Sequence, residues 1–190
     1  ACGGHALTGP IAVIDFETTG LSPAQGDRAT EVAVVLVQGG QVVGRFQSLM
    51  NAGVRISPFI ESFTGISNAM VAAAPPAAQV MAEAARFVGS APLVAHNAGF
   101  DRRFWQAELA RLGPDAPAAH NPFACTMLLA RRLYPQAPGH RLGTLAAFHA
   151  LPTAGRAHRA LADAEVAAAL LARIQADLCH RFALAEASHS

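Results

Sequence analysis

Lysine is absent from this sequence: all fourteen basic side chains are arginines. An acid that the fold buries therefore cannot be paired with a lysine. The planar fork of arginine suits bidentate contacts with phosphate, but a compositional bias towards alanine and arginine explains the missing lysines better. The net charge is only +1, so no bulk basic field indicates a nucleic-acid partner by itself.

Long apolar runs and cysteines are scarce as well. No apolar run approaches the roughly 20 residues of a membrane span, and residues 1–9 lack the charged and apolar segments of a signal peptide. The three cysteines are odd in number and far apart, which fits neither a disulfide framework nor a zinc site and favours a reducing, cytoplasmic setting. We therefore expect a cytoplasmic protein with no membrane partner.

Composition indicates one globular α/β domain. Of the 190 residues, 52% are hydrophobic and 14% are charged, which suits a sizeable core rather than a disordered chain. We expect a single domain over residues 10–182, with a flexible leader at residues 1–9 and a short C-terminal tail at residues 183–190.

The order of strand and helix patterns predicts a mixed sheet. Three strand patterns come first, and Gly39 and Gly40 mark a two-residue hairpin between the last two. Strands then alternate with helices, which indicates a mixed five-stranded sheet flanked by helices. The first expected strand begins with the apolar run 11–14 and breaks into a turn at residues 18–20 (TTG). The other expected strands are residues 30–37, 41–49, 91–95 and 122–125, and the main expected helices are residues 75–88, 98–112, 126–134, 142–150 and 159–181.

Two acids close the first strand pattern. Asp15 and Glu17 are two residues apart, so on a strand they point to the same face. Neighbouring carboxylates repel each other, and a divalent cation between them is a common solution. A solvated strand end with two ordinary acids is the equally open alternative.

Two more acids lie on apolar helical stripes. Asp101 shares its stripe with Trp105 and Leu109, and Asp163 shares one with Leu170. Each lies in the first turn of its helix, where a carboxylate favours the helix dipole by ~0.3–1 kcal/mol. The dipole explains an acid in the first turn but not its inward position. Burying an unpaired carboxylate costs several kcal/mol, so each needs a partner.

One site would satisfy all of these acids. If Asp15, Glu17, Asp101 and Asp163 converge, oxygen ligands without a thiol favour a hard cation, Mg²⁺ or Mn²⁺. Their combined charge would hold two divalent ions ~3.5–4 Å apart. His158, five residues before Asp163, could take a proton from a bound water. The alternative for His158 is a solvated loop histidine.

Three motifs, taken in order, resemble a known family. They are residues 15–21 (DFETTGL), 96–101 (HNAGFD) and 158–163 (HRALAD). Together they are similar to the three exonuclease motifs of the DEDDh 3′→5′ exonucleases, above all the proofreading (epsilon) branch of bacterial DNA polymerase III. The similarity extends over residues 11–176, and the spacing from His158 to Asp163 is that of the histidine subclass.

The resemblance implies a fold and a reaction. It implies a ribonuclease H-like fold and a metal-dependent exonuclease that releases nucleoside 5′-monophosphates from single-stranded or frayed DNA 3′ ends. Asp15, Glu17 and Asp163 would hold one metal, and Asp101 would support a second that Asp15 also binds. His158 would deprotonate the attacking water.

The resemblance also suggests substrate contacts. Thr18 would lie beside the terminal nucleotide, and Leu21 would act as an apolar wedge between the last two bases. Phe63 would flank the same bases, although ordinary core packing is the alternative for both Leu21 and Phe63. Asn97 would contact the substrate or serve only as a helix N-cap.

Two other functions stay open at this point. One is an RNA exonuclease of the oligoribonuclease or ribonuclease T type, and the motif at residues 15–21 favours DNA over it. The other is a non-catalytic module of a polymerase, which the complete set of four acids and His158 argues against. The expected partners are nucleic-acid 3′ ends, with a DNA polymerase subunit as a further possibility.

Overall fold

The computed structural model describes residues 9–188, with side chains as far as Leu184. Residues 1–8 of the expected leader therefore lie outside the described residues. Within the part of the chain that is described, no helix is both long and apolar enough to cross a membrane.

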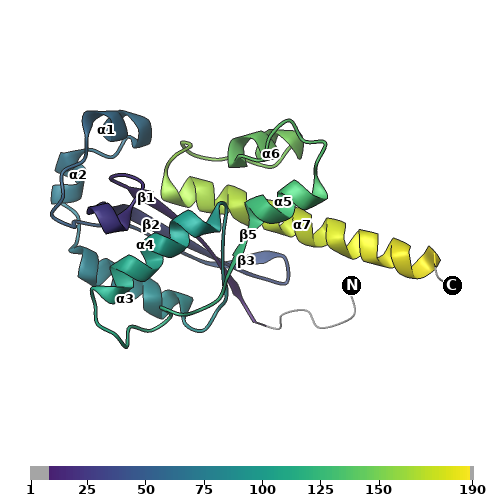
Figure 1. Cartoon of the computed structure of the whole chain (residues 1–190), viewed down its shortest axis with the longest axis horizontal. Helices are drawn as coiled ribbons and strands as arrows, with labels where there is room; N and C mark the ends of the chain where they lie inside the picture. Colours follow the sequence, from purple (N-terminus) through teal and green to yellow (C-terminus); the bar gives the residue numbers. More distant parts are fainter. Residues whose placement is uncertain (1–8, 189–190) are drawn as a thin grey trace.

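A five-stranded mixed sheet forms the centre of the domain, as the sequence predicts (Figure 1). Its strand order is β3-β2-β1-β4-β5. The first three strands are antiparallel, whereas β4 and β5 run parallel to β1. Gly39 and Gly40 have φ values of 58° and 77°, as the predicted two-residue hairpin requires. The strands are β1 (Ile11–Thr18), β2 (Ala29–Gln38), β3 (Gln41–Leu49), β4 (Leu93–Ala95) and β5 (Phe123–Cys125).

The helices begin near the predicted positions, but the last one is longer than expected. It continues to Ser188, past the expected end near Arg181, because no glycine or proline follows Ala160. The expected tail is thus helical as far as Ser188. The helices are η1 (Pro23–Gln25), α1 (Pro58–Thr64), α2 (Asn68–Ala72), α3 (Ala77–Val88), α4 (Ala98–Ala110), α5 (Thr126–Leu133), α6 (Leu142–Phe148) and α7 (Ala160–Ser188).

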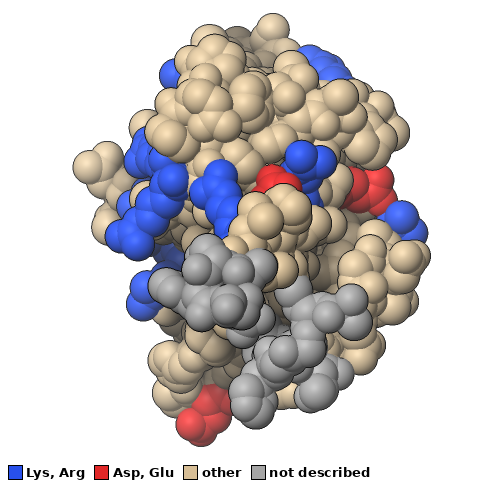
Figure 2. Space-filling model, turned by 90° about the vertical axis from the view of Figure 1, so that its right-hand side faces the viewer, with Lys and Arg blue, Asp and Glu red and all other residues tan. Residues whose placement is uncertain are grey.

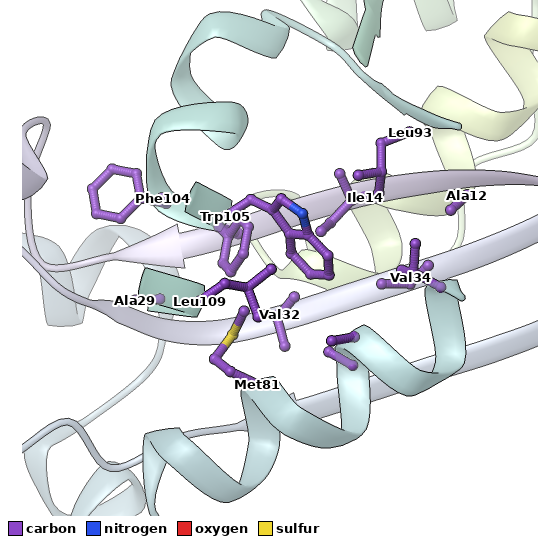
Figure 3. Close-up of a cluster of buried hydrophobic side chains, with 14 of the residues drawn as sticks. Ala12, Ile14, Ala29, Val32, Val34, Met81, Leu93, Phe104, Trp105 and Leu109 are labelled. Carbon is purple, nitrogen blue, oxygen red and sulfur yellow. The ribbon is translucent and has the colours of Figure 1, made fainter. Parts of the chain in front are cut away.

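Helices cover the sheet on both faces, and β1 divides its side chains between them. Ile14 and Phe16 point into the core beneath α3 and α4, where Trp105 is fully buried (Figure 3). Ile11 and Val13 point to the other face, against α7. Because side chains alternate along a strand, the next two odd-numbered residues of β1 also belong to the α7 face.

A buried ion pair fastens the start of β2 to α4. Glu108 is 3% exposed and accepts hydrogen bonds from Arg28 Nε at 2.8 Å and Nη2 at 2.9 Å. Its Oε1 also accepts the Ala29 N–H at 3.2 Å. The pair therefore holds the chain just after the turn that leaves β1.

Removing Glu108 should destabilise the fold strongly. In Glu108→Ala the Arg28 guanidinium would stay largely buried without its counter-charge, which costs about 3–5 kcal/mol of unfolding free energy. Urea denaturation measures this loss. Glu83→Ala on α3, where Glu83 accepts only a solvent-exposed hydrogen bond from Gln79, should change stability by less than about 0.5 kcal/mol. Equal losses in both variants would contradict the anchoring role of Glu108.

Candidate metal centre

Three carboxylates meet at the end of β1 on the α7 face. Asp15, Glu17 and Asp163 each offer an oxygen atom, and these atoms all lie within 4.8 Å of one another. The alternation of β1 side chains brings the first two to this face, and the first turn of α7 supplies the third. Oxygen ligands at this spacing can hold a hard divalent cation.

Asp101 reaches the same region from the opposite face of the sheet. It is 2% exposed, and its Oδ1 accepts the Phe16 N–H at 3.0 Å. The structure thus groups three of the four predicted acids and places the fourth beside them, hydrogen-bonded to the backbone of β1. The charge of Asp101 still acts on Asp15, whose pKa it helps to raise.

The carboxylates lack compensation for their burial. Burial raises the pKa of Asp15 well above its usual range, and the charges of Asp101 and Glu17 raise it further. Burial, with the charge of Asp163, raises the pKa of Glu17 to about 9. Burial also raises the pKa of Asp101 to about 8, although the hydrogen bond from the Phe16 N–H acts to lower it. Asp15 Oδ2 is buried with no hydrogen-bond partner in the described part of the chain. A divalent cation would satisfy this atom and favour the ionised carboxylates.

His158 lies at the edge of the carboxylate group. Its backbone N–H donates to Asp163 Oδ2 at 3.1 Å, and its charge helps to offset the burial that raises the pKa of Asp163. Its φ of 61° is in the left-handed region, which is uncommon for a residue other than glycine. The imidazole stacks on the Phe63 ring with centroids 4.0 Å apart. The side chain is thus exposed beside the acids and in contact with α1.

Sequence reasoning missed the anchor that holds this loop. Glu31 faces Glu17 across the β1–β2 ladder and is 1% exposed. It accepts Arg159 Nε at 3.1 Å, Arg159 Nη2 at 2.8 Å and the Ala160 N–H at 2.9 Å. Burial would raise the pKa of Glu31, but these hydrogen bonds outweigh it and the pKa is lowered. An acid within an otherwise apolar strand was the available signal, since such an acid needs a fixed partner.

The turn after β1 presents Leu21 to solvent. Leu21 is 77% exposed, so the alternative of core packing is wrong for it. The hydroxyl of Thr18 donates to the Gly20 carbonyl at 2.7 Å, and Asp27 accepts the Thr19 hydroxyl at 3.2 Å. A Cβ on Gly20 would lie 2.5 Å from the Asp27 carboxylate, so a larger residue there would displace the side chain that braces the turn.

Helix α1 presents two stacked aromatic rings beside His158. Phe63 is 46% exposed and Phe59 is 74% exposed, with ring centroids 6.0 Å apart and an interplanar angle of 10°. Core packing is therefore wrong for Phe63 too. Exposed rings of this kind can stack on nucleobases.

The residues before α4 have different environments. Asn97 is exposed and occupies the N-cap position with φ 64° and ψ 56°, but its side chain makes no capping hydrogen bond. The predicted N-cap position is thus confirmed but without a side-chain cap, because the backbone adopts the left-handed conformation that asparagine tolerates. His96 is held in place by two contacts: its ring lies 2.8 Å from the Thr126 hydroxyl and 2.7 Å from the His140 carbonyl.

Comparison with known proteins places this arrangement in context. Residues 12–171 match the RNase_T family, described as Exonuclease. The DNA polymerase III PolC-type protein of Halalkalibacterium halodurans is 37% identical over 175 residues, which are 92% of this chain and 12% of that protein. The 3′-5′ exonuclease DinG of Bacillus subtilis is 38% identical over 156 residues, 82% of this chain and 16% of that protein. The chain thus spans less than a fifth of the length of these relatives.

Solved structures show the same fold. Exonuclease X in complex with 5′ overhanging duplex DNA is 33% identical and superposes with a TM-score of 0.71, covering 88% of this chain and 92% of that chain. A 3′-exonuclease solved with histone mRNA stem-loop has a TM-score of 0.77 at 19% identity, covering 92% of this chain and 66% of that chain. The second likeness concerns the fold alone.

Replacing Asp15 should abolish stabilisation by metal. An ion at 100 times its dissociation constant would raise the unfolding free energy of the wild type by about 2.7 kcal/mol. Metal should raise the unfolding free energy of Asp15→Asn by almost nothing. Without metal, Asp15→Asn should be more stable than the wild type, because one repelling charge is gone. Thermal unfolding with Mg²⁺, Mn²⁺ or EDTA measures both effects. Exposed Asp115 supplies the matched control, Asp115→Asn, and an identical metal response in both variants would refute the assignment.

The metal-free protein should lose stability as pH rises. The pKa of Glu17 is raised from 4.5 to about 9, so the folded state binds more protons than the unfolded state between these values. Stability is then highest near the unfolded pKa and falls as pH rises towards about 9. Thermal unfolding in EDTA at a series of pH values measures the slope. Glu17→Gln should flatten it, and a slope unchanged by this variant would contradict the burial of the Glu17 carboxylate as its cause.

Proposed function

Because the chain belongs to the RNase_T exonuclease family, we propose that it is a metal-dependent 3′→5′ exonuclease that releases nucleoside 5′-monophosphates from single-stranded or frayed DNA ends. The observation that carries this proposal is the group of Asp15, Glu17 and Asp163, which contains a buried, unpartnered carboxylate oxygen and has His158 at its edge. Family membership confirms the resemblance drawn from the three motifs.

The acids would hold the metal. Asp15, Glu17 and Asp163 supply oxygen ligands for one divalent ion, Mg²⁺ or Mn²⁺, and Asp101 with Asp15 would support a second. When bound, such ions lower the pKa of an attacking water and neutralise charge on the phosphoryl group and the leaving oxygen. The Phe16 N–H fixes the Asp101 carboxylate, so this acid keeps one orientation beside Asp15.

His158 would serve as the general base. Its exposed imidazole can accept a proton from a water at the edge of the carboxylate group and release it to solvent. Its backbone is held on one side by Asp163, and the next residue is held by Glu31. These contacts keep the base close to the acids while its ring stays accessible.

Exposed apolar side chains would contact the 3′ end of the nucleic acid. Leu21 projects from a turn braced by Asp27, which suits a wedge between the last two bases, and Phe63 lies beside His158. We further assign Thr18 and Asn97 to the neighbourhood of the terminal nucleotide. Melting one base-pair step costs ~1.4 kcal/mol, so a mismatched end would be captured more readily than a paired one.

DNA is the preferred substrate in this proposal. Its support is the DNA bound in the structure of Exonuclease X and the polymerase named in the PolC-type relative. The same relative supports a polymerase as a partner. We also propose DNA replication as the role and the cytoplasm as the setting. RNA remains the second candidate substrate, and a direct comparison of the two decides between them.

The proposal is tested by following strand shortening. Single-stranded DNA, matched duplex, 3′-mismatched duplex and RNA, each 5′-labelled, are incubated with Mg²⁺ or Mn²⁺. We expect mononucleotide release, faster from single-stranded and mismatched DNA than from RNA or matched duplex. Release that survives EDTA would refute the metal requirement, and faster digestion of RNA would reverse the choice of substrate.

His158→Gln should slow turnover by about 10²- to 10⁴-fold, the usual contribution of a general base. Metal-dependent thermal stabilisation and strand binding should persist, because the backbone N–H to Asp163 remains. Single-turnover rates with saturating enzyme measure the loss. The matched control is His120→Gln, which changes an exposed histidine on the loop after α4 and should leave the rate unchanged. A His158→Gln rate within about threefold of the wild type would remove His158 as the base.

A further inference from the structure

A polar cavity lies between α5, α6 and the latter half of α7. Its volume is about 440 Å³. Aromatic and cationic side chains line it. The polar and charged lining residues that matter here are Tyr134, His149, Arg173, Asp177, His180 and Arg181. None of these residues belongs to the carboxylate group at the end of β1.

Two arginines in this cavity are held in place but keep free donors. Arg173 Nε donates to Asp177 Oδ2 at 3.1 Å, and Arg181 Nη2 donates to the Leu133 carbonyl at 2.7 Å. A guanidinium has five N–H donors in a fixed fork, so each side chain retains donors for an incoming anion. Asp177 also accepts the Tyr134 hydroxyl at 2.6 Å, which leaves one carboxylate against two guanidinium groups.

A buried ring nitrogen lies in the same walls without a partner. His149 Nε2 is buried and has no hydrogen-bond partner in the described part of the chain. The ring packs edge-on against Tyr134 with centroids 4.3 Å apart. A buried polar atom without a partner is costly, and an anionic oxygen in the cavity could accept a hydrogen bond from it.

The cavity lies on the helix that also carries Asp163. Arg173 and Arg181 follow Asp163 by ten and eighteen residues, which at 1.5 Å per residue is roughly 15 and 27 Å along α7. For a strand stacked as in a duplex, with a rise of about 3.4 Å per nucleotide, these distances correspond to roughly four to eight nucleotides. Figure 1 shows α7 extending past α5 and α6 to the C-terminal end of the domain.

Arginine side chains are visible on the surface at this end of the molecule (Figure 2). Figure 2 faces this end and shows arginine side chains gathered on one side of the view. The whole chain carries a net charge of only +1, so these arginines are not part of a general basic field.

We propose that this cavity binds a backbone phosphate of the nucleic-acid strand, roughly four to eight nucleotides upstream of the bond being cleaved. The inference rests on the proposed exonuclease function. Arg173 and Arg181 would contact the phosphate, and His149 would add a hydrogen bond. The site would favour long strands without reading their sequence, because phosphate contacts carry no base information.

The test compares a short and a long strand. Single-stranded DNA of 3 and of 12 nucleotides is digested by the wild type and by the double variant Arg173→Gln/Arg181→Gln. We expect the KM for the 12-mer to rise by roughly tenfold or more, since charge-assisted contacts to phosphate are lost. The kcat and KM for the 3-mer should stay unchanged, because it cannot reach the cavity. The salt dependence of 12-mer binding should also become shallower.

Two controls separate this site from general charge effects. Arg86→Gln removes an exposed arginine from the last turn of α3 and should leave both substrates unaffected. Arg173→Lys/Arg181→Lys keeps the charges and should recover part of the affinity for the 12-mer. An equal loss in Arg86→Gln, an equal loss on both strand lengths, or an unchanged KM for the 12-mer would each overturn the proposal.

Binding without cleavage distinguishes this inference from the proposed function. Fluorescence anisotropy of the labelled 12-mer is measured in EDTA, so the result does not depend on turnover. If the wild type digests neither strand, the proposed function fails, yet weaker 12-mer binding by the double variant would still support the cavity. Equal binding by the wild type and the double variant would refute it, even if inorganic phosphate binds to the wild type.

Discussion

Repulsion among the acids at the end of β1 is the constraint on which the rest of the structure depends. Asp15, Glu17 and Asp163 offer oxygens within 4.8 Å of one another, and Asp101 adds its charge from the other face. Without a cation, burial and mutual repulsion raise all their pKa values. The hydrophobic packing of α3, α4 and α7 must therefore hold together groups that would otherwise separate. The stability given up there would be recovered when a divalent cation binds.

Alternation along β1 explains how two faces of one sheet supply a single site. Even-numbered residues such as Ile14 and Phe16 are buried against α3 and α4, while Asp15 and Glu17 point towards α7. Asp163 lies next to these acids, whereas Asp101 extends from α4 and accepts a hydrogen bond from the backbone N–H of Phe16. The ribonuclease H-like fold thus brings together three carboxylates from one face and a fixed neighbour from the other.

Local patterns were sufficient to predict the architecture but only part of the site. The Gly39–Gly40 hairpin and the strand and helix order were confirmed, because turn chemistry and periodicity are local properties. The inward position of Asp101 was also correct, since helical spacing determines which face a side chain occupies. The Arg159–Glu31 pair was missed, because its members are 128 residues apart and only the packing of α7 on β2 brings them together. The exposure of Leu21 and Phe63 likewise depends on tertiary contacts that periodicity does not encode.

The absence of lysine makes the roles of the buried acids easier to separate. Arginine is the only long cationic side chain available, and Arg28 and Arg159 each form a bidentate pair with a buried glutamate. Those glutamates, Glu108 and Glu31, are structural because their charge is already compensated. In the described part of the chain, none of the acids at the end of β1 forms an ion pair with arginine. An acid that the fold buries and leaves without arginine is therefore the one available for a metal, and this distinction applies wherever a chain compensates its buried charges with arginine alone.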